Sequence, residues 1–449
     1  MTDAALSAAP SSQSYEERFP EAFRQPFWRR FGPLVFLIGL VLYFVYAIWF
    51  FDVGTVMRSG HWDRAGVFLS DWVSWSVTAE FRTSSGTVTP RYPKYSPLGT
   101  DPHPDWVIAN GDGTTTVEIA GKGDAVTVGP ADAFVSKGGE TVHVKLGGDK
   151  PVILGPQPTW FATNDDGDLI ATYGFSDQIV VETDRIKVNR RFFGWPNFFF
   201  DTDSPFFGKS AGQDISLILA GPDLVAGRAN WLLAFDNFWN NAEWQHGDVL
   251  TKLLQTLVMA FLGTILGAIV ALPLSFLAAR NITPNGVVNQ GLKRLFDFLR
   301  SVDMLIWALF FTRAFGPGPL AGSAAIFLTE TGTLGKIYSE GLENIDDKER
   351  EGITSTGADP LNVQRFGVVP QIVPVLVSQT LYQWESNTRS ASIIGAVGAG
   401  GIGLKLWEAM ATNANWPNVA YMVLLILIVV FCFDAASNAI RSRLIGRER

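Results

Sequence analysis

The sequence has a single cysteine, Cys432, and a deficit of basic charge. One cysteine excludes any disulfide within the chain. The 35 basic residues are outnumbered by 43 acidic ones, and this formal charge of −8 argues against a nucleic-acid partner, which requires a basic face. Charged residues make up only 17% of the chain and hydrophobic residues 47%. This composition favours a membrane part joined to a water-exposed part, since it is too apolar for an ordinary soluble enzyme.

A complete phosphate-binding P-loop is also missing. The segment FFGKS at residues 206–210 ends like one, but the first glycine of the motif would have to stand where Asp203 is. We therefore expect this chain not to hydrolyse ATP by itself.

Residues 395–403, GAVGAGGIG, contain the G-x-G-x-x-G spacing of dinucleotide-binding loops. A dinucleotide fold would need a βαβ unit and an acidic residue about 20 positions further on. The chain instead runs into an apolar segment, with no Asp or Glu between Glu408 and Asp434. The glycines are better explained as a surface without side chains, where helices pack closely or backbone lines a passage. Tight packing without contact to solute is the alternative.

Apolar segments of the chain predict about six membrane-spanning helices. The three long segments are 33–51, 253–277 and 419–440, and the three weaker ones, interrupted by Gly, Pro or polar residues, are 299–315, 320–334 and 368–384. Arginines cluster before the first segment and after the last, which places both termini in the cytoplasm by the positive-inside rule. The first segment lacks a cleavage site and is expected to remain as an anchor.

Between the first two long segments, residues 52–246 contain no run that could span a bilayer. β-Branched alternation broken by glycine-containing turns predicts antiparallel strands in 106–154 and a strand pair in 177–188. Acidic residues outnumber basic ones here, as expected of a translocated segment.

The predicted fold class is an all-α polytopic membrane protein with an inserted extracytoplasmic β-rich domain. The expected parts are a cytoplasmic segment at 1–32, the first span at 33–51, the insertion at 52–246, and a membrane core at 247–449 with a cytoplasmic loop at 336–370.

That loop contains EREGITSTGADPLNVQRFGVVP at residues 349–370. Gly357 suits the position after a helix end, and Asp359 and Pro360 suit the cap and the first residue of the next helix. The pattern predicts a helix-turn-helix elbow on the membrane surface, or, as the simpler alternative, a plain connector between spans.

The elbow resembles the cytoplasmic loop of ABC importer permeases, which reads E-A-A, three residues, Gly, nine residues, then I-x-L-P. Glu351, Gly357 and Pro370 stand at those spacings, with Val369 in the Leu position. The chain departs from the pattern at its two Ala and its Ile, where it has Gly352, Ile353 and Gly367. The Gly after the Glu, with the similar segments 255–281 and 385–403, makes the chain look like a phosphonate-type permease. The resemblance covers roughly residue 221 to the end and, loosely, the first span, but not the insertion.

In that family the elbow implies a coupling helix that docks on a separate ATPase dimer. The residues carried over to that role are Glu351, Gly352, Thr354, Gly357, Ala358 and Pro370. The resemblance further implies an inner-membrane homodimer that takes phosphonate, phosphite or phosphate from an external solute-binding protein and moves it by alternating access. ATP and Mg²⁺ would be bound by the partner, with no cofactor or metal in this chain.

Ionisable side chains near membrane depth are site candidates because a charge there is costly unless it is paired or lies in a cavity. They are Arg300, Asp303, Glu385 and Arg389. Glu385 and Arg389 are one helical turn apart and could pair with each other, or Arg389 could face the pathway, where a guanidinium suits an oxyanion. The full set predicted for the pathway or its gate is Gln255, Asn387, Arg389, Ser390, Ser392, Gly398, Gly400 and Gly401.

Three other interpretations compete with this one. A methionine-type importer permease would share the Gly-Ala-Gly-Gly run. A membrane-anchored ligand sensor or scaffold would have no stable ATPase partner, and a membrane oxidoreductase would bind nicotinamide at the glycine loop. For the insertion, we hypothesise that it docks the binding protein or shields the entrance.

Overall fold

The computed structural model describes residues 27–60, 69–82, 88–93, 97–99, 102–119, 123–148, 150–164, 167–174, 177–412 and 416–445. The chain divides into two compact units, Met1–Gly66 and Val67–Arg449. Most of the predicted cytoplasmic segment 1–32 lies outside the described residues.

The first unit contains α3 (Phe27–Phe50) and the short α4 (Val53–Ser59). α3 covers the predicted span at 33–51 except for its last residue. Its apolar side chains are exposed, with Phe36 at 72% and Trp49 at 75%. A helix that is apolar all round suits a lipid environment.

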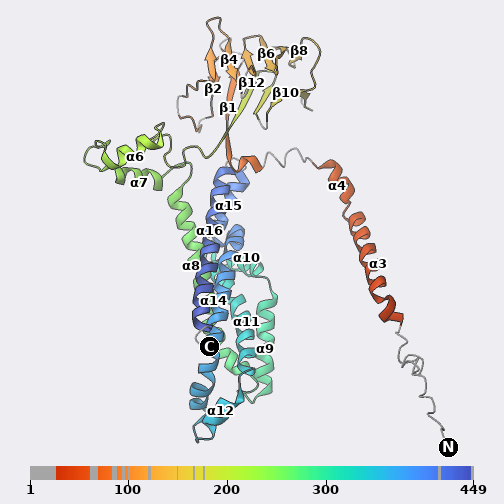
Figure 1. The fold of residues 1–449 in the computed structure, drawn as a ribbon, viewed down its shortest axis with the longest axis vertical. Coiled ribbons are helices and arrows are strands. Elements are labelled where there is room, and N and C mark those ends of the chain that lie inside the picture. The colour runs from red at the N-terminus through yellow and green to blue at the C-terminus, as the bar shows by residue number, and fades with distance from the viewer. Residues whose placement is uncertain are drawn as a thin grey trace, which may run out of the picture. The chain divides into compact units, whose positions relative to one another are not determined.

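The second unit begins with two antiparallel sheets of six strands each (Figure 1). The first sheet has the order β2-β1-β12-β11-β10-β9, and its strands are β1 (Ser74–Arg82), β2 (Pro90–Arg91), β9 (Phe161–Thr163), β10 (Leu169–Tyr173), β11 (Asp177–Val181) and β12 (Arg185–Phe193). The second sheet follows chain order and consists of β3 (Val107–Ala109), β4 (Thr115–Glu118), β5 (Ala125–Val128), β6 (Asp132–Lys137), β7 (Glu140–Lys145) and β8 (Val152–Ile153).

Alternation of side chains builds the core of these strands. In β1, Val77, Ala79 and Phe81 are buried while the residues between them are partly exposed. Ala79 and Phe81 pack in one apolar cluster with residues of the second sheet such as Val126 and Val135. The strands predicted in 106–154 are confirmed, and so is the pair in 177–188, where Gln178 opposes Asn189.

The strands occupy only part of the predicted insertion, because β12 ends at Phe193. Two helices follow, α6 (Ala211–Ala220) and α7 (Asn230–Trp239). The FFGKS segment leads into α6, and the Ser210 backbone N–H donates to Gln213 Oε1 at 2.9 Å at the helix start. The segment that resembles a P-loop in sequence therefore leads into α6 and provides its N-cap.

Helices make up the rest of the unit. They are α8 (His246–Ala278), α9 (Gly286–Ser301), α10 (Met304–Phe315), α11 (Pro319–Glu343), α12 (Asp347–Thr354), α13 (Pro360–Val363), the π-helical turn η1 (Gln364–Val368), α14 (Val369–Ile394), the π-helical turn η2 (Gly395–Ala399), α15 (Gly401–Thr412) and α16 (Trp416–Ile445). The predicted helix at 299–315 is wrong as a single element. Asp303 accepts a hydrogen bond from the Leu305 backbone N–H and starts α10, so the chain breaks after α9.

Glycines bring α8 and α11 close together. A Cβ on Gly263 would come 2.5 Å from the Ile326 Cβ, and one on Gly267 would come 2.8 Å from the Glu330 Cβ. Small residues of this kind let membrane helices approach through their backbones. By length and composition, α3, α8 and α16 could each cross a membrane, and residues 360–399 with α15 would add a fourth crossing if that bent pair is one span.

An aromatic cluster joins the end of the strand region to the bundle. The buried His246 ring, at the start of α8, donates to the Phe198 carbonyl at 2.7 Å and lies 2.9 Å from the Tyr421 hydroxyl of α16. Trp195 and Trp244 pack beside them, with ring centroids 5.2 Å apart. The chain leaving β12 is therefore anchored on two membrane helices.

Candidate functional site

The segment between α11 and α14 folds as a helix-turn-helix elbow. α12 begins after Asp346, whose carboxylate accepts a hydrogen bond from the Lys348 backbone N–H at 3.0 Å. Gly357 follows α12 with a φ of +79°, a left-handed conformation that favours glycine. Asp359 and Pro360 are the N-cap and the first residue of α13. These positions have the structural roles that the sequence predicts.

Two contacts hold the elbow against its neighbours. Arg350 Nη1 donates to the Asn281 carbonyl just beyond α8 at 3.1 Å, while Nη2 pairs with Asp347 at 2.9 Å. Gly367, in η1, lies so close to α12 that a Cβ there would come 3.3 Å from the Arg350 Cα. The elbow is therefore packed against both the end of α8 and the start of α14.

The outer surface of the elbow is open to solvent. Of the residues predicted to couple to an ATPase, Ala358 is half-buried and the others, Glu351, Gly352, Thr354, Gly357 and Pro370, are exposed. Leu361, in α13, has 75% of its surface exposed.

The glycine-rich segment bends the chain between α14 and α15. Residues 360–399 meet α15 at an angle of 60°. At the bend Gly401 has a φ of +71°, and a Cβ there would come 2.3 Å from Thr256 Oγ1 of α8. The same hydroxyl accepts a hydrogen bond from the Ile402 backbone N–H at 2.9 Å. Gly401 is thus required both for its backbone conformation and for space.

Backbone contacts continue on the other side of the bend. The Gly318 N–H, just before α11, donates to the Gly398 carbonyl at 3.0 Å. A Cβ on Gly400 would come 3.0 Å from the Pro319 ring. The segment therefore packs closely against α8 and α11, and its exposure to a solute stays a prediction.

The remaining polar residues predicted for the pathway lie on α8 and α14. Asn387 is 2% exposed and donates to Thr264 Oγ1 at 2.9 Å. Gln255 Oε1 is buried and meets no hydrogen-bond partner in the described part of the chain. Ser390 and Ser392 are half-buried. The structure therefore places Asn387 against α8. The roles of these four polar residues in transport stay predictions.

Glu385 and Arg389 do not pair with each other. Glu385 Oε2 accepts from Arg441 Nη2 at 3.3 Å, and Arg389 Nη2 lies 4.0 Å from Asp434 Oδ1. Both partners belong to α16, which packs along α14, so contacts between helices replace the local pairing considered from the sequence. The Arg389 side chain keeps 57% of its surface exposed, and its pairing at that distance is loose.

A buried carboxyl in α11 was missed by the sequence analysis. Glu330 is 3% exposed, and its Oε2 meets no hydrogen-bond partner among the described residues. The Asn387 side chain interacts with this carboxyl, and Gly267 of α8 leaves room for it. Glu330 lies within the apolar segment 320–334, so the rule that selected Glu385 and Arg389 would also have found it.

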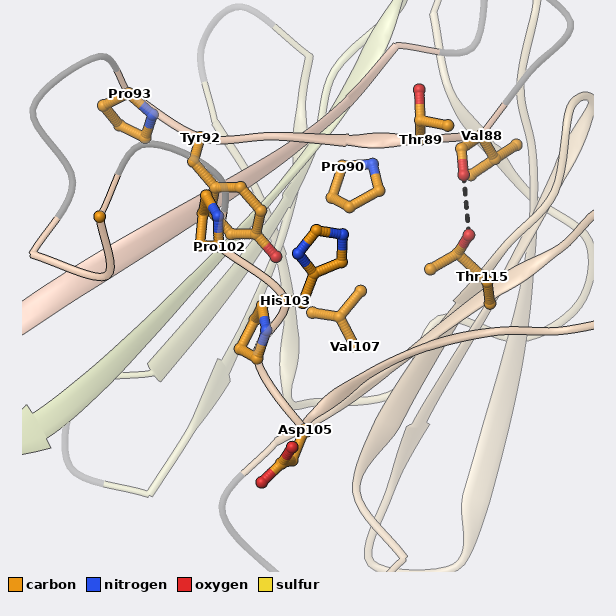
Figure 2. Close-up of a pocket in the computed structure, with 13 residues that line it drawn as sticks. Val88, Thr89, Pro90, Tyr92, Pro93, Pro102, His103, Asp105, Val107 and Thr115 are labelled. Atoms are coloured by element: carbon orange, nitrogen blue, oxygen red, sulfur yellow. Dashed lines mark hydrogen bonds between the residues drawn. The ribbon is translucent and has the colours of Figure 1, made fainter. Parts of the chain in front are cut away.

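The strand region has a separate cavity of about 750 Å³. Figure 2 shows Tyr92 and His103 facing it beside Pro90 and Val107. Burial raises the pKa of the Tyr92 hydroxyl to about 12, and its oxygen has no hydrogen-bond partner among the described residues. The phenol is therefore a neutral hydrogen-bonding group at physiological pH. Across the described ranges, no three His, Cys, Asp or Glu side chains gather as a metal site would require.

Residues 263–446, which contain the elbow and the glycine bend, match the family model described as binding-protein-dependent transport system inner membrane component. The chain is 37% identical over 196 residues to the phosphate-import permease protein PhnE of Mycolicibacterium smegmatis, an alignment that covers 44% of this chain and 37% of that protein. It is 36% identical over 192 residues to the phosphite transport system permease protein PtxC of Stutzerimonas stutzeri, covering 43% of this chain and 70% of that protein.

A third relative is a cryptic phosphonate transport system permease protein, PhnE2, of Escherichia coli. It is 45% identical over 121 residues, which are 27% of this chain and 98% of that protein. The chain thus spans well under half of the first relative's length and most of the other two.

Proposed function

We propose that this chain, which belongs to the family of binding-protein-dependent transport system inner membrane components, is the permease subunit of an ABC importer for phosphonate or a related phosphorus oxyanion such as phosphite or phosphate. The observation that carries the proposal is the 36% identity to a phosphite permease across 70% of that protein. The substrate class follows from the names of the relatives. The elbow is the segment through which an ATPase subunit would contact the permease.

The elbow is the part of this chain that receives mechanical work. Its exposed face, with Leu361, would sit in a groove of a separate ATPase subunit. Because Arg350 and Gly367 pack α12 against the end of α8 and the start of α14, a displacement of α12 would move both helices together. Rigid-body motion of this kind is how closure of an ATPase dimer would produce alternating access.

The topology proposed is six crossings, with both termini in the cytoplasm and the strands outside. One feature supports it: within Val67–Arg449, Figure 1 shows α12 at the end of the bundle away from α15 and the strands. An elbow that faces the ATPase would then leave the strands on the receiving side, where a solute-binding protein delivers substrate. A second copy of the chain would complete the pathway.

Arg389 is the side chain on α14 best suited to meet an oxyanion. Its guanidinium is more than half exposed, and Asp434 at 4.0 Å neutralises it only loosely. A guanidinium binds phosphorus oxyanions through paired N–H donors. This proposed role of Arg389 in oxyanion binding rests on the proposed function of the chain as a permease.

Uptake measurements test the function directly. The chain is copurified with its native ATPase and binding protein, reconstituted in proteoliposomes, and assayed for ATP-driven uptake of labelled phosphite. Unlabelled phosphonate or phosphate should compete, and methionine should not. Competition by methionine would favour a methionine-type permease, and absence of any copurifying ATPase would favour a ligand sensor.

For the strand region we propose a role in docking the binding protein. Ser74 and Phe193 are opposed partners at the base of β1 and β12, about 5 Å apart, so residues 75–192 can be replaced by a short Gly-Ser linker. The excised protein should keep its folded bundle and lose affinity for the binding protein. Unchanged affinity together with unchanged uptake would reject this role.

A further inference from the structure

The α6–α7 hairpin has two apolar faces, of which one is used for internal packing. Leu233 and Ala234 of α7 are buried against Phe206, with Leu217 and Ile218 of α6 beside them. This inner face gives the hairpin its own small core.

The other face is exposed and strongly apolar. In α7, Trp231, Phe235 and Trp239 recur at every fourth position and have exposed fractions of 59%, 59% and 38%. In α6, Ile215 and Leu219 recur with the same spacing and are 58% and 79% exposed. Residues four positions apart lie on one side of a helix, so each helix presents an apolar stripe outward.

Hydrogen bonds from a single side chain close the hairpin. Asn230, which is 4% exposed, donates to the carbonyls of Leu217 at 2.8 Å and Pro222 at 2.9 Å. Its Oδ1 accepts from the Leu224 N–H at 2.9 Å. The two helices are therefore held in one arrangement, and the outer stripes have fixed positions.

Contacts at the end of α7 place the hairpin level with the start of a membrane helix. A Cβ on Gly247, in the first turn of α8, would come 2.5 Å from Trp239 Nε1. Phe238 stacks on His246 with ring centroids 4.0 Å apart. Figure 1 shows α6 and α7 lying across the direction of α8 rather than along it. α8 is long and apolar enough to span a membrane, and its apolar run begins at Leu253, so its first turn lies in the interfacial region just outside the hydrocarbon core.

We propose that the α6–α7 hairpin lies in the interface of the outer leaflet, with the Trp231–Phe235–Trp239 stripe and the Ile215–Leu219 stripe in lipid. Trp and Phe are the side chains enriched at this depth. The occupant is lipid rather than a second copy, because the stripes adjoin the first turn of α8 and lie crosswise to it, in the plane of the bilayer surface.

The charges of the hairpin determine which lipids it needs. Asp236 pairs with Arg228 at 3.0 Å, and Asp214 and Asp223 are the other charged residues of the two helices and their connection. With no basic excess, attachment is apolar and does not depend on anionic lipid. The hairpin thereby fixes how far above the bilayer the strands are held.

Site-directed fluorescence tests this inference, and it does not require transport activity. In a Cys432→Ser background, which removes the single cysteine, Phe235→Cys and Leu219→Cys are each labelled with an environment-sensitive dye in nanodiscs of zwitterionic phosphatidylcholine. Ala220→Cys is the matched control, since it is exposed on α6 and is turned about 100° from Leu219.

We expect bromine on the lipid chains to quench the dyes at 235 and 219 at least twofold more than the dye at 220, and aqueous iodide to show the reverse order. The result should be the same with anionic lipid added. Iodide quenching at 235 and 219 without bromolipid quenching would overturn the proposal. So would a disulfide between Phe235→Cys residues of two copies, which would assign the stripe to a protein interface. Because 219 is on the outer surface and contributes little packing, its variant tests the proposal even if the variant at 235 fails to fold.

Discussion

The elbow and the glycine bend both depend on a glycine with positive φ, but their surroundings differ. Gly357 has a φ of +79°, and a Cβ there would meet no atom within 4 Å among those described. Gly401 has a φ of +71°, and a Cβ there would be only 2.3 Å from Thr256 Oγ1. The first glycine sets a turn on an open surface, whereas the second sets a turn and also lets two helices touch. The same residue type therefore forms a surface turn in one place and allows close helix packing in the other.

Replacement of Gly401 should have the largest effect. Gly401→Ala combines a disfavoured backbone conformation with a steric clash, so we expect a loss of about 2–4 kcal/mol in the free energy of unfolding and loss of transport. Thermal unfolding in detergent measures the first, and uptake the second. Gly291→Ala is the control, because that glycine is on the surface of α9 and a Cβ there meets nothing within 4 Å. Equal stability of the two variants would contradict the packing role.

Replacement of Gly357 should abolish coupling but keep the fold. Gly357→Pro cannot adopt the positive φ and loses the N–H that donates to the Thr354 carbonyl at 3.0 Å, so the elbow changes shape. We expect ATP hydrolysis without uptake and an unfolding midpoint close to that of the native protein. Gly357→Asn, which tolerates this conformation better, should retain part of the uptake. Normal uptake by the proline variant would count against the coupling role.

A third glycine, Gly267, has no positive φ and serves only the close packing of α8 on Glu330 of α11. Glu330→Gln keeps the shape and the interaction with Asn387, so we expect stability equal to or above that of the native chain. Glu330→Ala removes the carboxyl that interacts with Asn387 and leaves a cavity in the bundle, while the Asn387 amide keeps its hydrogen bond to Thr264, so it should cost about 1–3 kcal/mol. Thermal unfolding of both variants provides the measurement. If the Gln variant loses as much as the Ala variant, the negative charge itself is needed inside the bundle.

The smallest effect concerns Glu243, just before α8. Burial raises the pKa of this carboxyl above its ordinary value of 4.5, although hydrogen bonds from Asn197 oppose the shift. A raised pKa in the folded state means that protonated Glu243 favours folding. This contribution is complete below the ordinary pKa and is lost as the pH rises through the folded-state value.

Glu243→Gln removes this titration. The unfolding midpoint of the native chain, compared with that of the variant, should therefore fall as the pH is raised from about 4 to about 7. Parallel pH profiles for the two proteins would contradict the assignment.

The elements predicted correctly from the sequence are those determined by residues close together in the chain. Alternating apolar residues identified the strand pair at 177–188, and Gly357, Asp359 and Pro360 identified the elbow, because turn and cap preferences act over a few residues. The break at Asp303 has the same kind of signal, an N-cap residue, but an apolar run on either side concealed it.

Contacts between distant parts of the chain were not predictable in this way. The partners of Glu385 and Arg389 lie on α16, and nothing in the residues around 385–389 indicates them. The α6–α7 hairpin escaped notice because two ten-residue helices next to many strands leave a weak periodic signal. The approach of Gly401 to Thr256 likewise depends on how α15 packs on α8.

Labelling of the elbow from each side of the membrane shows which compartment it faces and whether an ATPase subunit covers it. Leu361→Cys in the Cys432→Ser background places one exposed thiol on α13, which a membrane-impermeant maleimide can label in sealed vesicles of either orientation. We expect labelling only when the cytoplasmic face is outward, and protection when the ATPase subunit is bound. Labelling from the external face, or equal labelling with and without the ATPase, would contradict it.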